Sequence, residues 1–319
     1  MSEATSTTNK QQVRAAWIEA MRPRTLPLAA AGSVVAAGIA AAAGQFRIEV
    51  LVLMFVTSIL LQIITNFADD YGDLSHGLDD ETRVGPKRGL QRGVITMKQM
   101  KLALVGTCAL TFAVGVALIL VAFSGGPAMT GSSWTAIVVF VVLGVACIAA
   151  AICYTIGKHP YGYIGLGDFM SFLFFGVVAV VGGTFLYLHE FTLVSLVAGI
   201  ALGLPVMAVM NANNMRDAKR DAAKGKRTVA NVLGDPKMRT YETALLAGGA
   251  ILFLVSLGML GIRNFLPFFI VTVSFMGWAR VIAVMWTMPD HEKFDCLMAP
   301  TSKGTVVVAV VWLIAVLIG

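Results

Sequence analysis

The chain has 319 residues, of which 57% are hydrophobic and only 13% are charged. Soluble proteins carry about 25% charged residues, so the composition excludes an ordinary soluble domain and indicates a membrane protein. The net charge of +6 does not indicate nucleic-acid binding, because the basic residues lie in short segments between long apolar runs, as membrane orientation requires.

The predicted elements begin with a polar, basic N-terminal segment, residues 1–25. Within it, residues 8–22 predict a short interfacial helix with Trp17 as an amphipathic anchor. Beyond it, nine segments each offer the roughly 20 mostly apolar residues that a membrane span requires. We therefore expect an all-α, multi-pass membrane helical bundle of about nine transmembrane helices, forming a single membrane domain over residues 1–319. The predicted spans are 26–44, 50–68, 101–123, 134–155, 164–187, 192–213, 241–261, 265–287 and 303–319.

The distribution of Lys and Arg predicts the orientation of these spans. Most of the 24 basic residues fall on the N-terminal side, which also carries the two longest polar loops, about 69–100 and 214–240. By the positive-inside rule this side faces the cytoplasm. Nine spans then place the N-terminus in the cytoplasm and the C-terminus outside.

Two similar acidic motifs follow directly on long apolar runs. Motif 1 is Asn66-Phe-Ala-Asp69-Asp70-Tyr-Gly-Asp73, and motif 2 is Asn213-Asn214-Met-Arg-Asp217-Ala-Lys-Arg-Asp221. Each precedes a basic stretch. The basic residues are Arg83, Lys87, Arg88 and Arg92 after motif 1, and Lys224, Lys226 and Arg227 after motif 2.

The spacing within each motif predicts a polar stripe on a helix end. Asn66, Asp70 and Asp73 lie at i, i+4 and i+7, and motif 2 repeats the pattern at i, i+4 and i+8, so each set shares one face. Asn66 and Asn213 are 147 positions apart, as are Asp70 and Asp217. This offset suggests a parallel pseudo-repeat of about four helices, an arrangement that places a site at the repeat interface.

The chemistry of both motifs indicates a cation bound together with a phosphate group. Stacked carboxylates repel one another unless a cation lies among them, and Mg²⁺ in proteins is bound by one or two carboxylates plus substrate phosphates. Motif 1 contains Asp-Asp-x-x-Asp, a pattern of enzymes that ionise allylic diphosphates. The simpler alternative is that each motif is a solvent-exposed acidic loop. That interpretation does not explain why the motif recurs at a matching position.

The motifs and their neighbours resemble the UbiA superfamily of intramembrane aromatic prenyltransferases, and within it the branch that prenylates 1,4-dihydroxy-2-naphthoate. The resemblance runs from the first span past the sixth. It rests on Arg22-Pro-Arg-Thr-Leu-Pro27, motif 1, Arg83-Val-Gly-Pro-Lys-Arg-Gly89, Tyr154-Thr-Ile-Gly, Pro160-Tyr-Gly-Tyr-Ile-Gly-Leu-Gly-Asp168, Asn214-Met-Arg-Asp217 and Gly225-Lys-Arg-Thr228. The 4-hydroxybenzoate branch usually has Asp at the positions of Phe67 and Leu74.

This resemblance implies a Mg²⁺-dependent transfer of a polyprenyl group from a polyprenyl diphosphate to the naphthoate, with loss of CO₂ and diphosphate, in a central cavity that faces the cytoplasm. It also implies a bacterial cytoplasmic (inner) membrane location and menaquinone synthesis. Asp70, Asp73, Asp217 and Asp221 would be catalytic. Asp168 is a further catalytic candidate, in proton transfer, because an ionisable residue within or near a span is a functional candidate; if the fifth span begins a few residues later, Asp168 is only an interfacial charge. The implied metal ligands are Asn66, Asp69, Asp70, Asp73, Asn213, Asp217 and Asp221.

The implied substrate-binding residues include four whose simpler roles stay open. Arg22 could instead be a membrane anchor, Tyr154 and Tyr161 could belong to the interfacial aromatic belt, and Lys158 could only set topology. The full set is Arg22, Lys87, Arg88, Tyr154, Lys158, Tyr161, Asn214, Lys226 and Arg227.

Two alternative functions remain at this stage. A related prenyltransferase could act on another acceptor such as 4-hydroxybenzoate, although the Asp-Tyr-Gly-Asp form of motif 1 speaks against it. A membrane transporter with a repeat-related acidic site would place its carboxylates near the bilayer midplane, whereas both motifs are predicted at helix ends. The sequence does not define the oligomeric state or the prenyl chain length.

Overall fold

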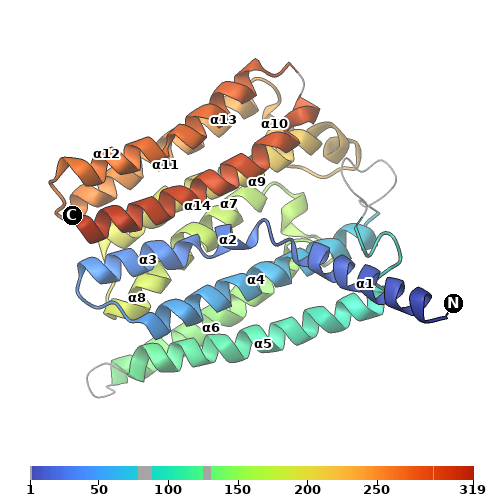
Figure 1. Cartoon of the computed structure of the whole chain (residues 1–319), viewed down its shortest axis with the longest axis horizontal. Helices are drawn as coiled ribbons and strands as arrows, with labels where there is room; N and C mark the ends of the chain where they lie inside the picture. The colour runs from blue at the N-terminus through green and yellow to red at the C-terminus, as the bar shows by residue number, and fades with distance from the viewer. Residues whose placement is uncertain (1, 78–87, 125–130, 290) are drawn as a thin grey trace.

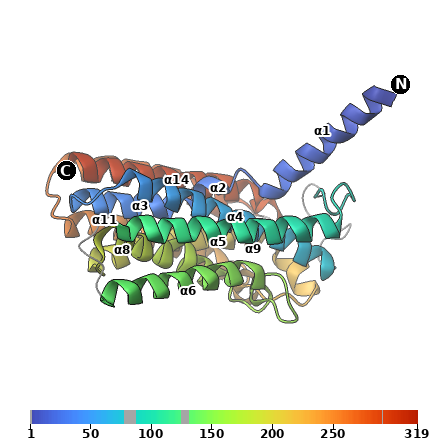
Figure 2. The same ribbon diagram turned by 90° about the horizontal axis from the view of Figure 1, so that it is seen from below.

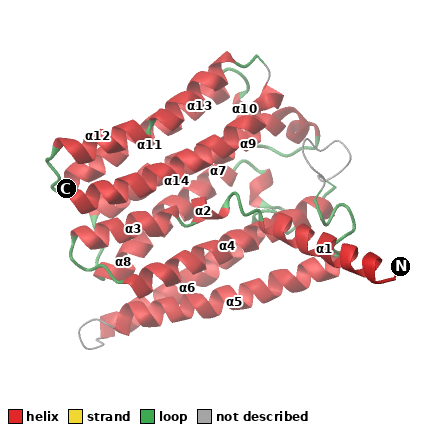
Figure 3. Cartoon of the chain, in the orientation of Figure 1, coloured by secondary structure: helices red, strands yellow, loops and turns green. Residues whose placement is uncertain are grey.

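The computed structural model of the chain describes residues 2–77, 88–124, 131–289 and 291–319. Within these ranges the fold is helical, and Figure 3 shows only helices and loops apart from the undescribed residues. The elements are α1 (Ser2–Met21), α2 (Leu26–Ala29), α3 (Ala31–Ala42), α4 (Ile48–Ser75), α5 (Met97–Ser124), α6 (Gly131–Cys153), η1 (Tyr161–Tyr163), α7 (Gly167–Ser171), η2 (Phe172–Gly182), α8 (Gly183–Leu188), α9 (Leu193–Ala223), α10 (Val229–Leu233), α11 (Lys237–Met259), α12 (Phe265–Ser274), α13 (Met276–Thr287), η3 (His291–Phe294) and α14 (Asp295–Ile318).

The predicted number of spans is confirmed for the described part of the chain, which contains nine helical segments long and apolar enough to cross a membrane. They lie side by side as one bundle (Figure 1), and the N- and C-termini are at opposite ends of it. Figure 2 shows that α1 projects from the bundle at an angle, whereas α3 lies within it. The all-α membrane bundle expected from the sequence is therefore what the chain forms.

Three spans are less regular than the hydropathy pattern predicts. The first is divided into α2 and α3, and the eighth into α12 and α13. The fifth consists of α7, the π-helical segment η2 and α8. The two polar loops begin later than the predicted bounds of 69–100 and 214–240, because α4 continues to Ser75 and α9 continues to Ala223. Both motifs therefore form the last turns of long helices.

Small residues hold η2 against α9. A Cβ atom on Gly176 would lie 2.4 Å from the Cα atom of Gly203 and 2.7 Å from the carbonyl oxygen of Gly199. Only glycine fits at this contact. Gly199 and Gly203 form a G-x-x-x-G pair, which lets helix backbones approach closely in a membrane.

Buried polar contacts supply a second source of cohesion, since burial of apolar surface does not drive association between helices in lipid. Asn211 of α9 donates to the Glu242 carboxylate of α11 at 2.8 Å, and neither side chain has exposed surface. The Trp312 indole of α14 donates to Ser256 Oγ of α11 at 2.9 Å. These contacts fix α9, α11 and α14 around the largest cluster of buried apolar residues.

Candidate active site

Motif 1 and motif 2 line a single cavity at the end of the bundle where α4 and α9 terminate. This cavity has a volume of about 210 Å³, and we call it the polar cavity. Its charged, amide and tyrosine lining residues are Arg22, Gln62, Asn66, Asp69, Asp73, Arg88, Tyr154, Tyr163, Asn213, Arg216, Asp217, Arg220 and Lys226. The structure thus brings together side chains from both motifs and from segments on either side of them.

Motif 1 lies on one face of α4, as its spacing predicts. Asn66 and Asp70 are each 1% exposed. Gly72 allows the close contact of this helix end with the chain after α6, because a Cβ atom there would lie 2.5 Å from the carbonyl oxygen of Thr155. Packing of the helix end therefore requires glycine at position 72 within the Tyr-Gly-Asp ending of motif 1.

Arg22 binds motif 1 with both ends of its guanidinium group. Its Nη1 donates to Asp69 Oδ2 at 2.9 Å and its Nη2 donates to Asp70 Oδ1 at 2.8 Å. The Asn66 amide fixes the preceding turn by donating to the carbonyl oxygen of Met21 at 2.9 Å. Arg22 itself adopts a left-handed backbone conformation, with φ of 51°. Such a conformation is uncommon for a residue with a side chain and marks a defined turn.

A second guanidinium reaches the same carboxylates from the loop after motif 1. Arg88 pairs with Asp70, and its Nη1 lies 3.9 Å from Asp73 Oδ2. The loop is held against α1 by an ion pair in which Arg92 Nη2 lies 2.6 Å from Glu19 Oε2. The predicted contribution of cations that follow motif 1 is therefore supported by Arg88. Lys87, which the sequence also indicates, lies outside the described residues.

Motif 2 is paired mainly with arginines of its own helix. Arg216 Nη2 lies 2.6 Å from Asp217 Oδ2 and donates to Asn213 Oδ1 at 2.8 Å. Arg220 lies 3.5 Å from Asp217. Lys226 Nζ lies 3.1 Å from Asp221 Oδ2. Three cationic side chains, Arg216, Arg220 and Lys226, thus surround a carboxylate pair that is almost fully buried.

Tyr163 connects the two motifs. Its hydroxyl group donates to Asp73 Oδ1 at 2.9 Å, and Lys226 Nζ lies over its ring, 5.6 Å from the centroid. Burial, reinforced by the Asp73 carboxylate, raises the pKa of Tyr163 well above its usual range. The phenol therefore remains a neutral hydrogen-bond donor to motif 1 while its ring contacts the cation that pairs with motif 2.

The carboxylates of the polar cavity can supply some, but not all, of the ligands that a divalent cation needs. Asp69 Oδ1 and Asp70 Oδ2 are buried and have no hydrogen-bond partner among the described residues. Within the same residues, however, no three His, Cys, Asp or Glu side chains are close enough to hold one ion together. This arrangement suits Mg²⁺, which takes one or two carboxylates and completes its shell with phosphate oxygens and water.

The polar cavity continues into apolar space at Tyr154. A second cavity of about 160 Å³, the proximal apolar cavity, shares Tyr154, Ser171 and Met210 with the polar cavity. Tyr161 lines it and lies edge-on to Tyr154, with ring centroids 5.4 Å apart. Burial raises the pKa of both phenols above the usual range, so the two rings present neutral aromatic surface.

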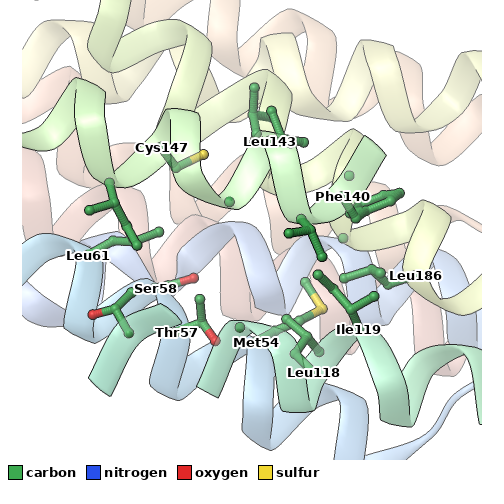
Figure 4. Close-up of a pocket in the computed structure, with 18 of the residues that line it drawn as sticks. Met54, Thr57, Ser58, Leu61, Leu118, Ile119, Phe140, Leu143, Cys147 and Leu186 are labelled. Carbon is green, nitrogen blue, oxygen red and sulfur yellow. The ribbon is translucent and has the colours of Figure 1, made fainter. Parts of the chain in front are cut away.

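A third cavity, the distal apolar cavity, extends the space deeper into the bundle. It has a volume of about 150 Å³ and shares Ser58, Leu61 and Cys147 with the proximal one. Figure 4 shows the labelled side chains of α4, α5, α6 and α8 pointing into this space, almost all of them apolar. The lining of the three adjoining cavities therefore changes from charged side chains at one end to apolar side chains at the other.

Some predicted residues lie away from the polar cavity. Lys158 and Arg227 are exposed and do not line it. Asp168 is 2% exposed and accepts a hydrogen bond from Asn214 at 2.9 Å, behind the cavity wall. The structure therefore does not bring Asp168 or Asn214 to the cavity surface. Asp70 and Asp221 do not line the cavity either, although their partners Arg88 and Lys226 do. The predicted roles of these four residues stay predictions.

Other residues of the site were not identified from the sequence. Arg216 and Arg220 occupy positions −1 and +3 relative to Asp217, so helical spacing could have indicated them. Gln62, which donates to Asn66 Oδ1 at 2.9 Å, lies one turn before motif 1. Tyr163 offered no such signal, because its contact with Asp73 spans 90 positions of sequence.

Comparison with known proteins agrees with this geometry. The UbiA prenyltransferase family model matches residues 30–303. A 1,4-dihydroxy-2-naphthoate octaprenyltransferase of Escherichia coli is 42% identical over 74% of this chain and 74% of its own length. Proteins of the same name from Haemophilus influenzae and Mycobacterium tuberculosis are 41% and 35% identical, over 75% and 76% of this chain and 75% and 77% of their own lengths.

Two solved structures share the fold at low sequence identity. The apo structure of a UbiA homolog from Aeropyrum pernix K1 superimposes with a TM-score of 0.64 at 16% identity, covering 94% of this chain and 97% of its own. A digeranylgeranylglyceryl phosphate synthase gives 0.61 at 15% identity, covering 96% and 99%. The bundle is thus the architecture of these proteins, and with the family model matching most of its length the chain belongs to the UbiA prenyltransferase family.

Proposed function

We propose that this prenyltransferase moves a polyprenyl group from polyprenyl diphosphate to 1,4-dihydroxy-2-naphthoate, yielding the quinol form of demethylmenaquinone, CO₂ and diphosphate. The observation that carries the proposal is the shared polar cavity of motif 1 and motif 2, which opens into apolar space at Tyr154. The acceptor is supported by the relatives named for this reaction at 35–42% identity.

The diphosphate would occupy the polar cavity between the two motifs. Each motif would hold Mg²⁺ through one or two carboxylates. The candidate ligands are Asp69, Asp70 and Asp73 with Asn66 in motif 1, and Asp217 and Asp221 with Asn213 in motif 2. When bound, the ions neutralise the negative charge that develops on the departing diphosphate. Arg88, Arg216, Arg220 and Lys226 already lie against these carboxylates. Their guanidinium and ammonium groups supply the donors for phosphate oxygens that are not bound to metal.

Tyr154 marks where the reacting carbon would lie, since it borders both the polar and the proximal apolar cavity. The C–O bond to diphosphate breaks and leaves an allylic cation beside the faces of Tyr154 and Tyr161, which stabilise positive charge. The electron-rich naphthoate ring forms the new C–C bond. Loss of CO₂ then returns an electron pair to the ring. The apolar cavities exclude the water that would otherwise quench the cation.

The rest of the prenyl tail would follow the proximal and distal apolar cavities toward the opposite end of the bundle. Arg22 is a candidate for binding the naphthoate carboxylate, because it lines the polar cavity and retains 26% side-chain exposure while paired with motif 1. A charge-assisted pair with a planar carboxylate suits a guanidinium group.

The end of the bundle that carries both motifs would face the cytoplasm. This orientation rests on the concentration of Lys and Arg on that side. It leaves the C-terminus outside, at the opposite end (Figure 1). The named bacterial relatives support the cytoplasmic (inner) membrane of a bacterium as the location.

The test is a reaction with purified protein in detergent, Mg²⁺ and a medium-length polyprenyl diphosphate. The naphthoate and 4-hydroxybenzoate are offered in parallel, with EDTA controls, and products are identified by mass. The expected product, absent with EDTA, is a decarboxylated prenyl-naphthoquinol, detected as such or as the naphthoquinone that oxidation by air forms from it. Prenylation of the benzoate alone would refute the acceptor, and the absence of product with either acceptor would refute the reaction.

A further inference from the structure

A groove between α13 and α14 carries two basic side chains that the proposed reaction does not use. It has a volume of about 730 Å³ and includes Arg280 of α13 and Lys303 of α14, and no Asp or Glu is among its described lining residues. Both cations are exposed. Neither has an ion pair or a side-chain hydrogen bond to another described residue.

Glycines create the groove. Gly277 of α13 faces Gly304 of α14, and a Cβ atom on Gly277 would lie 3.9 Å from the Gly304 Cα atom with no closer neighbour. Beneath Gly304 lies the Trp278 ring, which is 2% exposed. A Cβ atom on Gly304 would lie 3.0 Å from its Nε1. This indole N–H is buried and has no partner among the described residues, and Trp278 is not itself among the described residues that line the groove.

Both cations of the groove lie about two helical turns inside the ends of their helices. Arg280 lies seven residues before the end of α13, and Lys303 lies eight residues after the start of α14. At 1.5 Å per residue both are roughly 10–12 Å from their helix ends. These ends are on the same side of the bundle as motif 2, because Asp295 at the start of α14 pairs with Arg216 at 2.5 Å. The α12–α13 pair lies at the edge of the bundle (Figure 1).

Charged side chains at this depth are costly unless they reach partners or the headgroup region. Arg280 and Lys303 extend from neighbouring helices into one groove, so a single anionic group between them would satisfy both. The groove is also bordered by exposed apolar side chains, with Val273 at 45% and Val307 at 51%. An occupant must therefore combine a negative headgroup with hydrocarbon.

We propose that this groove binds an anionic phospholipid of the surrounding leaflet. Its phosphate lies between Arg280 and Lys303, and its acyl chains lie along Val273 and Val307. Basic pockets between membrane helices bind anionic lipid headgroups in this way. The site is separate from the polar cavity, with which it shares no lining residue.

The experiment is native mass spectrometry of the full chain in detergent, titrated with phosphatidylglycerol or, separately, phosphatidylcholine. The test variant combines Arg280→Gln with Lys303→Gln. The matched control combines Lys98→Gln with Lys101→Gln, which removes two exposed charges from the first turns of α5 on the predicted same side. A third variant, Gly277→Leu, fills the groove but keeps both charges.

We expect the wild type to retain phosphatidylglycerol in preference to phosphatidylcholine. The apparent affinity should fall about thirtyfold in the double groove variant, at about fivefold per charge. It should fall in Gly277→Leu as well and stay unchanged in the control. An equal loss of lipid affinity in the control would mean that general surface charge causes the effect, and it would overturn the proposed lipid site. Unchanged binding in the double groove variant, or displacement of the lipid by millimolar inorganic phosphate, would also overturn the proposal.

Discussion

Tyr163→Phe is the sharpest test of the link between the two motifs. The substitution removes one hydroxyl group, which donates to Asp73 Oδ1 at 2.9 Å, and keeps the ring that lies under Lys226. A hydrogen bond to a charged group is worth about 1.5–3 kcal/mol. Loss of a residue that orients a metal ligand typically costs 10–100-fold in metal affinity, and the two magnitudes agree because 1.4 kcal/mol is a factor of about ten.

We therefore expect the Mg²⁺ concentration for half-maximal activity to rise roughly 10–100-fold in Tyr163→Phe, with turnover largely restored at saturating Mg²⁺. The assay is product formation against Mg²⁺ concentration in detergent, accompanied by Mn²⁺ binding measured calorimetrically. Tyr161→Phe is the matched control, since its hydroxyl group donates to the carbonyl oxygen of Ala150 at 2.8 Å and not to a carboxylate. An unchanged Mg²⁺ dependence in Tyr163→Phe, or an equal change in Tyr161→Phe, would refute the reasoning.

Three further predictions concern the metal ligands, the acceptor and the tail. Asp70→Ala and Asp217→Ala should each lower turnover by roughly 10²–10³-fold or more. Both variants should still insert into the membrane and elute as folded protein in size-exclusion chromatography. Near-normal turnover in either variant would refute the metal-site proposal. Arg22→Ala should raise KM for the naphthoate about 10–100-fold through loss of charge-assisted hydrogen bonds, and a change confined to KM for the diphosphate would assign Arg22 to the other subsite. Cys147→Phe should fill the junction of the two apolar cavities and lower the rate with long prenyl diphosphates relative to geranyl diphosphate. The control Cys153→Phe, at an exposed position, should leave this ratio unchanged. Equal rates for both chain lengths in Cys147→Phe would exclude this route for the tail.

The sequence predicted what depends on local pattern. Apolar length alone identified the nine spans, because every backbone polar group in the hydrocarbon must be satisfied within a helix. The helical spacing of Asn66, Asp70 and Asp73 predicted their common face correctly, since α4 continues through the motif. The break between α12 and α13 and the π-helical turns of η2 were not predictable in this way, because an apolar run has the same hydropathy whichever helix type it adopts.

The partners of the carboxylates were much less predictable than the carboxylates themselves. The basic stretches after each motif suggested the cations, and Arg88 and Lys226 do pair with Asp70 and Asp221. Arg22, however, reaches Asp69 and Asp70 from 47 and 48 positions away. That contact depends on how the turn after α1 lies against α4, which is a property of the tertiary structure and leaves no periodic signal.

This pairing has a consequence for how the site is loaded. An aspartate that is 1% exposed, such as Asp70, is costly to bury unless its charge is compensated, and Arg22 and Arg88 both lie against its Oδ1 atom. A divalent cation that binds the other oxygen, Oδ2, does not have to displace either guanidinium group, because this oxygen has no partner among the described residues. Metal and arginine can therefore share one carboxylate, with the arginines also directed at the phosphate oxygens that the metal brings. In this way a strongly acidic motif can serve as a binding site for a diphosphate.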